Sequence, residues 1–286
     1  MKPTSVFKSL AALCAIAGPA SFSHAAIYSQ SFDYGASTLD FGSDLSGQGW
    51  SDNTGTIDYV PGAGLNYTGL VGATGGALSY DFSTTGDRRA WETFTADPFT
   101  GAAVGTESWV FALGSVPTSI TDGETNVYFA AGSIVNEIIF QMTGTGVSIS
   151  AFDNASNTFT AVASSSFNTD GTTTAFLMQI IQGSGTSPTN STVNAWINPD
   201  LSNLGTPDGT ITSKIGRANQ AFTDVFYGAN NNGTAAKGGA AGTYIWDEVR
   251  FTDDFGDIYV VPEPSTFAIL AGFAALGLVL YRRRMR

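Results

Sequence analysis

Carboxylates and hydroxyls are the groups of this sequence that could do chemistry, because imidazole and thiol groups are nearly absent. The chain has one Cys, Cys14, and one His, His24, and both lie in the first 25 residues. We predict below that this segment is removed. The remaining chain would then lack a thiolate nucleophile, a disulfide, a Cys/His zinc site and a Ser-His-Asp triad.

A carboxylate-based hydrolase needs two acidic side chains about 5–9 Å apart across the scissile bond. Asp247 and Glu248 are adjacent, and adjacent residues of a regular strand point to opposite faces. Strict alternation predicts one face with Ile245, Asp247, Val249 and Phe251, and another with Tyr244, Trp246, Glu248 and Arg250. We therefore expect that the protein is not an enzyme, and a secreted polysaccharide hydrolase is the competing hypothesis.

An acidic cluster follows the last apolar run. Asp253, Asp254 and Asp257 lie within five residues of one another. Carboxylates on a turn supply the hard oxygen ligands that Ca²⁺ prefers. A calcium site and a solvated acidic loop are both consistent with this pattern, and no other cofactor is expected.

Aromatic rings could bind carbohydrate by stacking against sugar rings. Trp50 and Trp91 are the predicted glycan-binding residues. Trp109 and Trp196 stand in apolar runs, which are more typical of a core.

The central segment is strongly acidic. Residues 26–260 contain 6 basic and 23 acidic residues, a net charge of −17. Nucleic acid is therefore not an expected partner, because phosphate contacts require a basic surface. Cations and neutral polysaccharides are more compatible with this charge.

Short apolar runs alternate with segments rich in Gly, Asn, Asp and Thr. Each run has the length of a strand and is rich in β-branched and aromatic residues, and none sustains helical spacing. Only 13% of the residues are charged, too few for the polar faces of amphipathic helices. The pattern predicts a single all-β sandwich. The main predicted strands are Ser108–Leu113, Asn126–Ala131, Glu137–Met142, Val147–Phe152, Ala175–Ile181, Thr192–Ile197 and Tyr244–Phe251.

Residues 1–25 have the three parts of a secretory signal peptide. Lys2 and Lys8 supply the positive charge, residues 10–17 form an apolar run, and Ser23-His24-Ala25 provides a small-residue exit. We predict a signal helix, export through the Sec translocon and cleavage between Ala25 and Ala26. A buried helix that opens the domain is the alternative interpretation.

The other end contains an apolar run, Phe267–Tyr281, with no charged residue. A helix of this length rises about 22 Å, short of the ~30 Å hydrocarbon core, but Ser265 and Thr266 can extend it. We predict a transmembrane helix at 265–281 and a basic tail at 282–286 that acts as a cytoplasmic stop-transfer signal. The alternatives are a buried core helix and a nucleic-acid-binding tail. The basic residues are Arg282, Arg283, Arg284 and Arg286.

The sequence VPEPS at 261–265, followed by the apolar run and the arginines, resembles the PEP-CTERM sorting signal of Gram-negative bacteria. The resemblance covers residues 261–286. It implies that an exosortase, a membrane-embedded cysteine transpeptidase-like enzyme, recognises Pro262, Glu263 and Pro264. The protein would then be anchored in the inner membrane before processing and afterwards be at the cell surface or extracellular.

A second resemblance concerns the central segment. The landmarks resemble those of concanavalin A-like jelly rolls of the lectin, glucanase and LamG type, which implies the same sandwich fold. Laminarinase-like members place their carboxylates in a Glu-x-Asp-x-x-Glu pattern, and this chain has no such run. The landmarks are Ser31–Tyr34, Gly47–Trp50, Val193–Leu201 and Trp246–Phe251.

These features predict a signal peptide at 1–25, a β-sandwich ectodomain at 26–260 and a sorting segment at 261–286. We expect an exosortase-sorted protein of the cell surface or extracellular matrix. The resemblance to sorted proteins implies a role among the exopolysaccharides of a biofilm.

Overall fold

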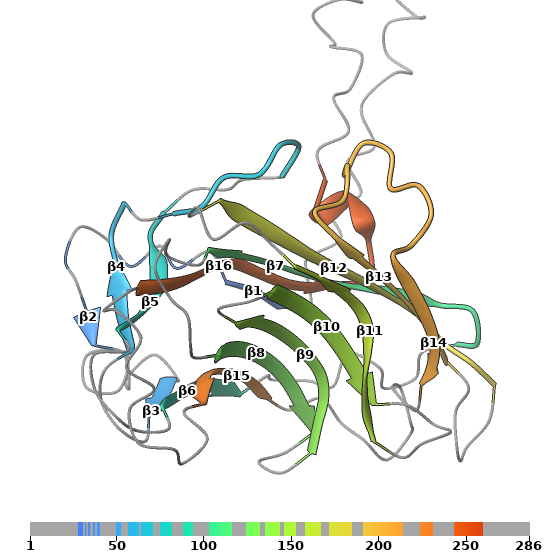
Figure 1. Cartoon of the computed structure of the whole chain (residues 1–286), viewed down its shortest axis with the longest axis horizontal. Helices are drawn as coiled ribbons and strands as arrows, with labels where there is room; N and C mark the ends of the chain where they lie inside the picture. The colour runs from blue at the N-terminus through green and yellow to red at the C-terminus, as the bar shows by residue number, and fades with distance from the viewer. Residues whose placement is uncertain are drawn as a thin grey trace, which may run out of the picture.

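A computed structural model of the chain shows two antiparallel β-sheets packed face to face (Figure 1). The described part contains sixteen strands and one short 3₁₀ helix, η3 (Phe255–Asp257). The structure describes residues 28–30, 32, 34, 37, 39–40, 50–52, 57–62, 64–70, 75–81, 88–93, 103–115, 124–131, 135–143, 146–152, 158–166, 172–184, 191–213, 224–230 and 243–259.

The nine-stranded sheet, here sheet A, has the order β14-β13-β12-β7-β16-β5-β4-β2, with β1 paired to β16. Antiparallel pairing joins all of these neighbours. The strands are β1 (Tyr28–Gln30), β2 (Leu39–Asp40), β4 (Ile57–Val60), β5 (Ala77–Asp81), β7 (Glu107–Ser115), β12 (Thr173–Ile181), β13 (Ser191–Ile197), β14 (Gly209–Ser213) and β16 (Thr243–Thr252).

The seven-stranded sheet, sheet B, has the order β11-β10-β9-β8-β15-β6-β3 and is also antiparallel. The chain passes from sheet A to sheet B and back at β5-β6-β7 and again at β14-β15-β16, as in jelly-roll sandwiches. The strands are β3 (Trp50–Asp52), β6 (Arg88–Thr93), β8 (Glu124–Ala131), β9 (Val135–Thr143), β10 (Gly146–Phe152), β11 (Phe159–Ser165) and β15 (Asp224–Asn230).

The predicted all-β jelly-roll sandwich is confirmed. The seven predicted apolar runs lie within β7, β8, β9, β10, β12, β13 and β16. None of the residues that the structure describes belongs to a helix long and apolar enough to cross a membrane. The predicted signal helix and transmembrane helix lie outside the described residues, as do Ala25, Ala26, the motif Pro262–Pro264 and the terminal arginines.

The main core lies between the two sheets. Phe140 of sheet B stacks on Phe176 of sheet A with ring centroids 5.5 Å apart, and Phe176 contacts Trp246 at 5.3 Å. All three side chains are fully buried. Each aromatic ring removes roughly 150–250 Å² from water, so these contacts supply much of the stability of the sandwich.

The first and last strands of the sandwich are neighbours. In β1, Tyr28 lies opposite Phe251 of β16, and Gln30 lies opposite Val249. The first described residues therefore join the sheet only through a strand that is more than 200 positions later in the chain.

Sheet A is apolar on its outer face as well. Along β7, Val110 and Ala112 face the main core, whereas Trp109, Phe111 and Leu113 belong to a second cluster on the other side. Three segments that carry apolar side chains cover this cluster, and Figure 1 shows them on the side of sheet A away from sheet B. We call them the outer cover, which consists of residues 64–70, 199–205 and 253–259.

Two glycines allow a direct test of the packing of the outer cover. Gly69 and Gly105 have nearly the same left-handed backbone, with φ of +87° and +86°. A Cβ on Gly69 would lie 2.7 Å from Cε2 of Tyr259, whereas nothing lies within 4 Å of a Cβ on Gly105.

Gly69→Ala should therefore destabilise the protein more than Gly105→Ala. Both changes should cost about 1–2 kcal/mol for the left-handed backbone, and Gly69→Ala should cost about 1–3 kcal/mol more because the Tyr259 ring must move. Urea unfolding of the two variants measures the difference. Equal losses would show that Tyr259 does not pack against Gly69 in solution.

Candidate functional site

An irregularity in β16 brings three charged side chains together on the outer face of sheet A. Asp247 lies opposite Leu113 and Arg250 lies opposite Phe111, so β16 has an extra residue relative to β7. This β-bulge places Glu248 at a φ of +50°, an uncommon conformation for a residue with a side chain.

The bulge changes which side chains of β16 share a face, compared with the regular alternation predicted from the sequence. Tyr244 and Trp246 face the main core as predicted for one face, but Val249 and Phe251 face the same core. The prediction of strict alternation is wrong beyond Asp247, because one extra residue reverses the side on which the following residues point. Asp247 and Arg250 therefore share a face.

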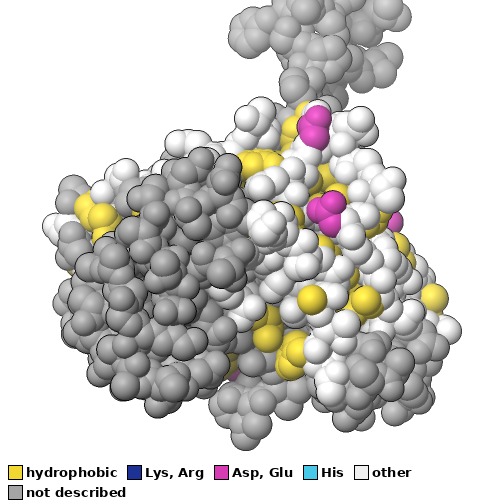
Figure 2. All heavy atoms as spheres, viewed as in Figure 1, with side chains coloured by type: hydrophobic (Ala, Val, Ile, Leu, Met, Phe, Trp, Pro, Cys, Tyr) yellow, Lys and Arg dark blue, Asp and Glu magenta, His cyan; other side chains and the backbone are white. Residues whose placement is uncertain are grey.

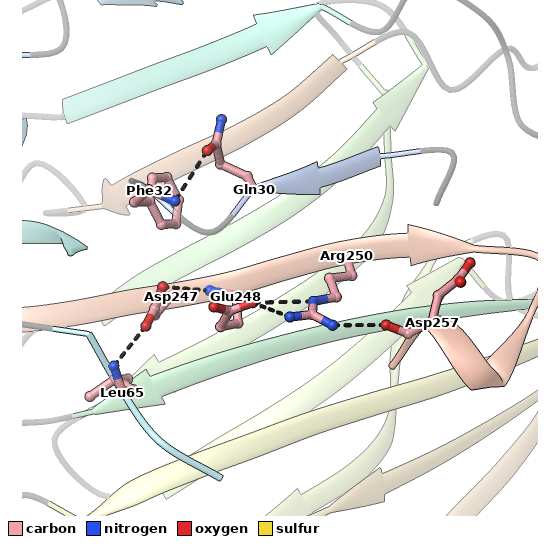
Figure 3. Close-up of polar contacts among 7 residues, drawn as sticks. All are labelled: Gln30, Phe32, Leu65, Asp247, Glu248, Arg250 and Asp257. Atoms are coloured by element: carbon pink, nitrogen blue, oxygen red, sulfur yellow. Dashed lines mark hydrogen bonds and ion pairs between the residues drawn. The ribbon is translucent and has the colours of Figure 1, made fainter. Parts of the chain in front are cut away.

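Hydrogen bonds connect this acidic bulge to the outer cover (Figure 3). The backbone N–H of Leu65 donates to Oδ2 of Asp247 at 2.7 Å. Nε of Arg250 donates to Oε2 of Glu248 at 3.2 Å, Nη2 forms an ion pair with the same carboxylate, and Nη1 donates to the carbonyl oxygen of Asp257 at 2.8 Å. Two of the three covering segments are thus joined to the bulge by polar contacts, and the Tyr67 hydroxyl donates to the carbonyl oxygen of Pro199 in the third at 2.6 Å.

The electrostatics of the bulge are dominated by burial. Asp247, Glu248 and Arg250 are exposed to only 2%, 0% and 5%. Burial is the main cause that raises the pKa of Asp247, and the neighbouring Glu248 carboxylate also raises it. Hydrogen bonds from the backbone N–H groups of Leu65 and Glu248 and the charge of Arg250 lower it, and the resulting pKa is about 8. These carboxylates lie beneath the outer cover and do not face solvent, so their evident role is to position the cover.

A second buried polar cluster connects the two sheets. The Tyr28 hydroxyl donates to Oε2 of Glu92 at 3.0 Å and lies 3.0 Å from the Tyr227 hydroxyl, while Nε2 of Gln30 donates to Glu92 at 3.4 Å. Burial raises the pKa of Glu92, against the lowering effect of the bonds from Tyr28 and Gln30. Burial also raises the pKa values of both tyrosines, so their hydroxyls stay protonated donors. These hydrogen bonds attach β1 of sheet A to β6 and β15 of sheet B.

The outer face of sheet B carries an aromatic pair. Ala90 and Val225 face the main core, so their neighbours Trp91 and Phe226 point to the other side. The two rings lie opposite each other across β6 and β15, with centroids 6.0 Å apart, and both are half-buried. In register they belong to a row across the sheet: Ser51, Trp91, Phe226, Tyr128, Ile139 and Ser150.

Polar side chains flank this row. In one neighbouring row the Ser148 hydroxyl donates to Oε1 of Gln141 at 3.3 Å, and both side chains are half-buried. On the other side the Thr93 hydroxyl donates to Oδ1 of Asp224 at 2.7 Å. The face therefore presents apolar rings between hydroxyl, amide and carboxylate groups, a combination suited to sugars, which have apolar C–H faces and hydroxyl edges.

Of the two predicted glycan-binding tryptophans, only Trp91 lies in this aromatic row. Trp50 pairs with Glu92, one register position away, so the two tryptophans do not occupy the same row. Sequence analysis missed Phe226, because a single Phe in an apolar run carries no signal for the side to which it points.

Two of the three predicted calcium ligands accept hydrogen bonds from nearby groups of the chain, and the third is exposed. Oδ1 of Asp254 accepts a hydrogen bond from the N–H of Gly256 at 2.8 Å and caps η3. Oδ2 of Asp257 accepts from the Thr252 hydroxyl at 2.6 Å, and Asp253 is exposed. Within the described ranges, no three Asp, Glu, His or Cys residues are grouped to hold a metal ion. The calcium site stays a prediction.

The buried Asp247 should make stability depend on pH. Its folded pKa lies above its unfolded value of 3.8, so the folded state retains a proton that the unfolded state loses. The free energy of unfolding should fall as pH rises from about 4 to about 8, with a slope of up to about 1.4 kcal/mol per pH unit from this group. Asp247→Asn, which resembles the protonated acid, should flatten this dependence.

Urea unfolding at several pH values between 5 and 8 measures the effect. Asp200→Asn is the control: bonds from the hydroxyl and N–H of Ser202 lower the pKa of Asp200, so its carboxylate is ionised throughout this range. The control should follow the unmodified protein. If Asp247→Asn also did so, Asp247 would not be the buried acid described here.

Solved structures with similar folds include three carbohydrate-active proteins. A carbohydrate esterase of the Shiga toxin-encoding bacteriophage phi24B has a TM-score of 0.46 and 10% identity, covering 79% of this chain and 97% of the esterase. Bacillus licheniformis beta-glucanase has a TM-score of 0.43 and 13% identity, with coverage of 79% and 97%. Alginate lyase Aly36B, in complex with alginate trisaccharide, has a TM-score of 0.42 and 12% identity, with coverage of 78% and 97%. Likeness at this level identifies no activity for this chain.

Comparison with curated proteins gives no match in sequence. Residues 260–284, in contrast, match the PEP-CTERM protein-sorting motif. The match confirms the resemblance identified at 261–286 and indicates an exported protein that is anchored at its C-terminal segment before processing. The chain therefore carries a PEP-CTERM protein-sorting motif at residues 260–284, after a β-sandwich, and this motif implies processing by an exosortase.

Proposed function

We propose that this protein is a non-enzymatic component of the cell surface or extracellular matrix whose sandwich binds polysaccharide through the outer face of sheet B. The half-buried Trp91–Phe226 pair, flanked by hydroxyl and amide side chains, is the observation that carries the proposal. Such a platform holds a sugar ring by stacking and its hydroxyls by hydrogen bonds.

The negative charge of the chain favours uncharged ligands over anionic ones. A net charge of −17 on residues 26–260 repels polyanions at long range, so a neutral polysaccharide is favoured over an acidic one. The buried position of Asp247 and Glu248 disfavours the competing hydrolase hypothesis, because their carboxylates lie under the outer cover and away from the aromatic row.

Trp91→Ala should weaken binding of short neutral oligosaccharides by about ten-fold, because loss of one stacking ring costs on the order of 1.4 kcal/mol. Phe159→Ala is a control, since Phe159 is an exposed aromatic residue on β11, at the opposite edge of sheet B. A glycan array identifies ligands, and calorimetry on both variants measures the affinity change.

A reducing-sugar assay on the same glycans separates binding from hydrolysis. Binding without sugar release supports the proposal, whereas turnover would favour the hydrolase. Equal affinity losses in the two variants, or no binding to any glycan, would contradict the assignment of the aromatic row.

Replacing Pro262, Glu263 and Pro264 by Ala tests the sorting motif. The exported protein should lose its C-terminal segment when the motif is intact and retain it when the motif is replaced, because the exosortase reads these residues. Mass spectrometry of the exported protein measures the difference. Identical processing of both forms would show that these three residues are not needed for processing.

A further inference from the structure

The point at which the sorting segment leaves the sandwich is firmly attached to the outer face of sheet A. Ile258 is fully buried in the outer cluster, and the Phe255 ring lies 4.7 Å from that of Trp109. Tyr259 forms a β-bridge with Leu70. The described chain therefore ends on this face, on the side opposite sheet B (Figure 1).

The tether between this point and the membrane is short. The sorting-motif match starts at residue 260, and five residues, 260–264, separate Tyr259 from the predicted span 265–281. The six steps from Tyr259 to residue 265 reach at most about 22 Å even when the chain is fully extended.

The sandwich is too large for this tether to pass around it. The main path of sheet A contains eight strands, and β7, beneath Phe255, has three on one side and four on the other. Trp109 lies two residues from the start of β7, so the shortest route to sheet B passes around the strand ends and covers about 17 Å, from two residues at ~3.4 Å and a sheet spacing of ~10 Å. A bilayer beyond sheet B would add a headgroup layer of about 5–7 Å, as well as the outer cover and the side chains of sheet B, and the total exceeds the reach of the tether. Sheet B therefore cannot face the bilayer while the chain is anchored.

We propose that, before exosortase cleavage, the outer cover of sheet A faces the lipid headgroups of the inner membrane and the outer face of sheet B points away from them. The proposal rests on the sorting segment as the membrane anchor. It does not depend on glycan binding, but it would leave the Trp91–Phe226 face open to polymers while the protein is still anchored.

The orientation is imposed by the tether and not by adhesion. Asp200 and Asp253 are exposed on the outer cover, and Figure 2 shows acidic side chains and no Lys or Arg among the described residues on that part of the surface. Carboxylates gain nothing from zwitterionic headgroups and are repelled by anionic ones. A longer tether should therefore abolish the preferred orientation.

Single cysteines can report the orientation, because Cys14 is the only natural one and lies in the predicted signal peptide. Asn203→Cys places a label on the outer cover, and Ser164→Cys places one on the outer face of sheet B; both positions are exposed. The anchored full chain, exported without an exosortase, is reconstituted in phosphatidylcholine vesicles that contain a headgroup-linked fluorescence acceptor. Energy transfer from position 203 should exceed that from position 164 several-fold.

A variant with a Gly-Ser linker of about 30 residues after Tyr259 is the matched control, since such a linker extends to about 100 Å. The contrast between the two labels should disappear in this variant. Equal transfer from both labels without the linker, or a contrast that survives the linker, would overturn the proposal. Protein that fails to float with vesicles would refute the anchor itself, whereas absence of glycan binding would affect only the proposed function.

Discussion

Sheet A has apolar side chains on both faces, and the rest of the structure follows from the need to bury both. One face is buried by sheet B, but Trp109, Phe111 and Leu113 on the other would remain in water without the outer cover. Chain segments with few regular hydrogen bonds must therefore be fixed on a flat sheet surface. The bulge of β16 solves this problem by turning Asp247 and Arg250 towards the cover, where they bind backbone groups of residues 65 and 257.

The sequence predicts the strands well because their signal is local. Runs such as Ala175–Ile181 are apolar on both sides, and the structure shows that β12 is buried on both faces. Such a run identifies a strand of a doubly covered sheet, but it does not say which element provides each cover. The outer cover is formed by contacts between residues as distant as Gly69 and Tyr259, which no local pattern encodes.

The bulge could not be predicted for a related reason. Alternation assumes a regular strand, and Asp247-Glu248-Val249-Arg250 contains no glycine that would suggest a residue with positive φ. Its conformation is stabilised by the ion pair between Glu248 and Arg250 and by the segments packed over it. Trp91 was identified from residue type alone, whereas its partner Phe226 became apparent only when the pairing of β6 with β15 was known.

The pairing of β1 with β16 has a consequence for secretion. The N-terminal residues leave a translocation channel first, but β1 cannot pair until β16 has also crossed. This topology therefore delays completion of sheet A until nearly the whole polypeptide has crossed. The contact of Tyr28 with Tyr227 must also wait, because Tyr227 follows Tyr28 by 199 positions. A chain with this topology favours late folding on the far side of the membrane, and its strands stay unpaired in the interval.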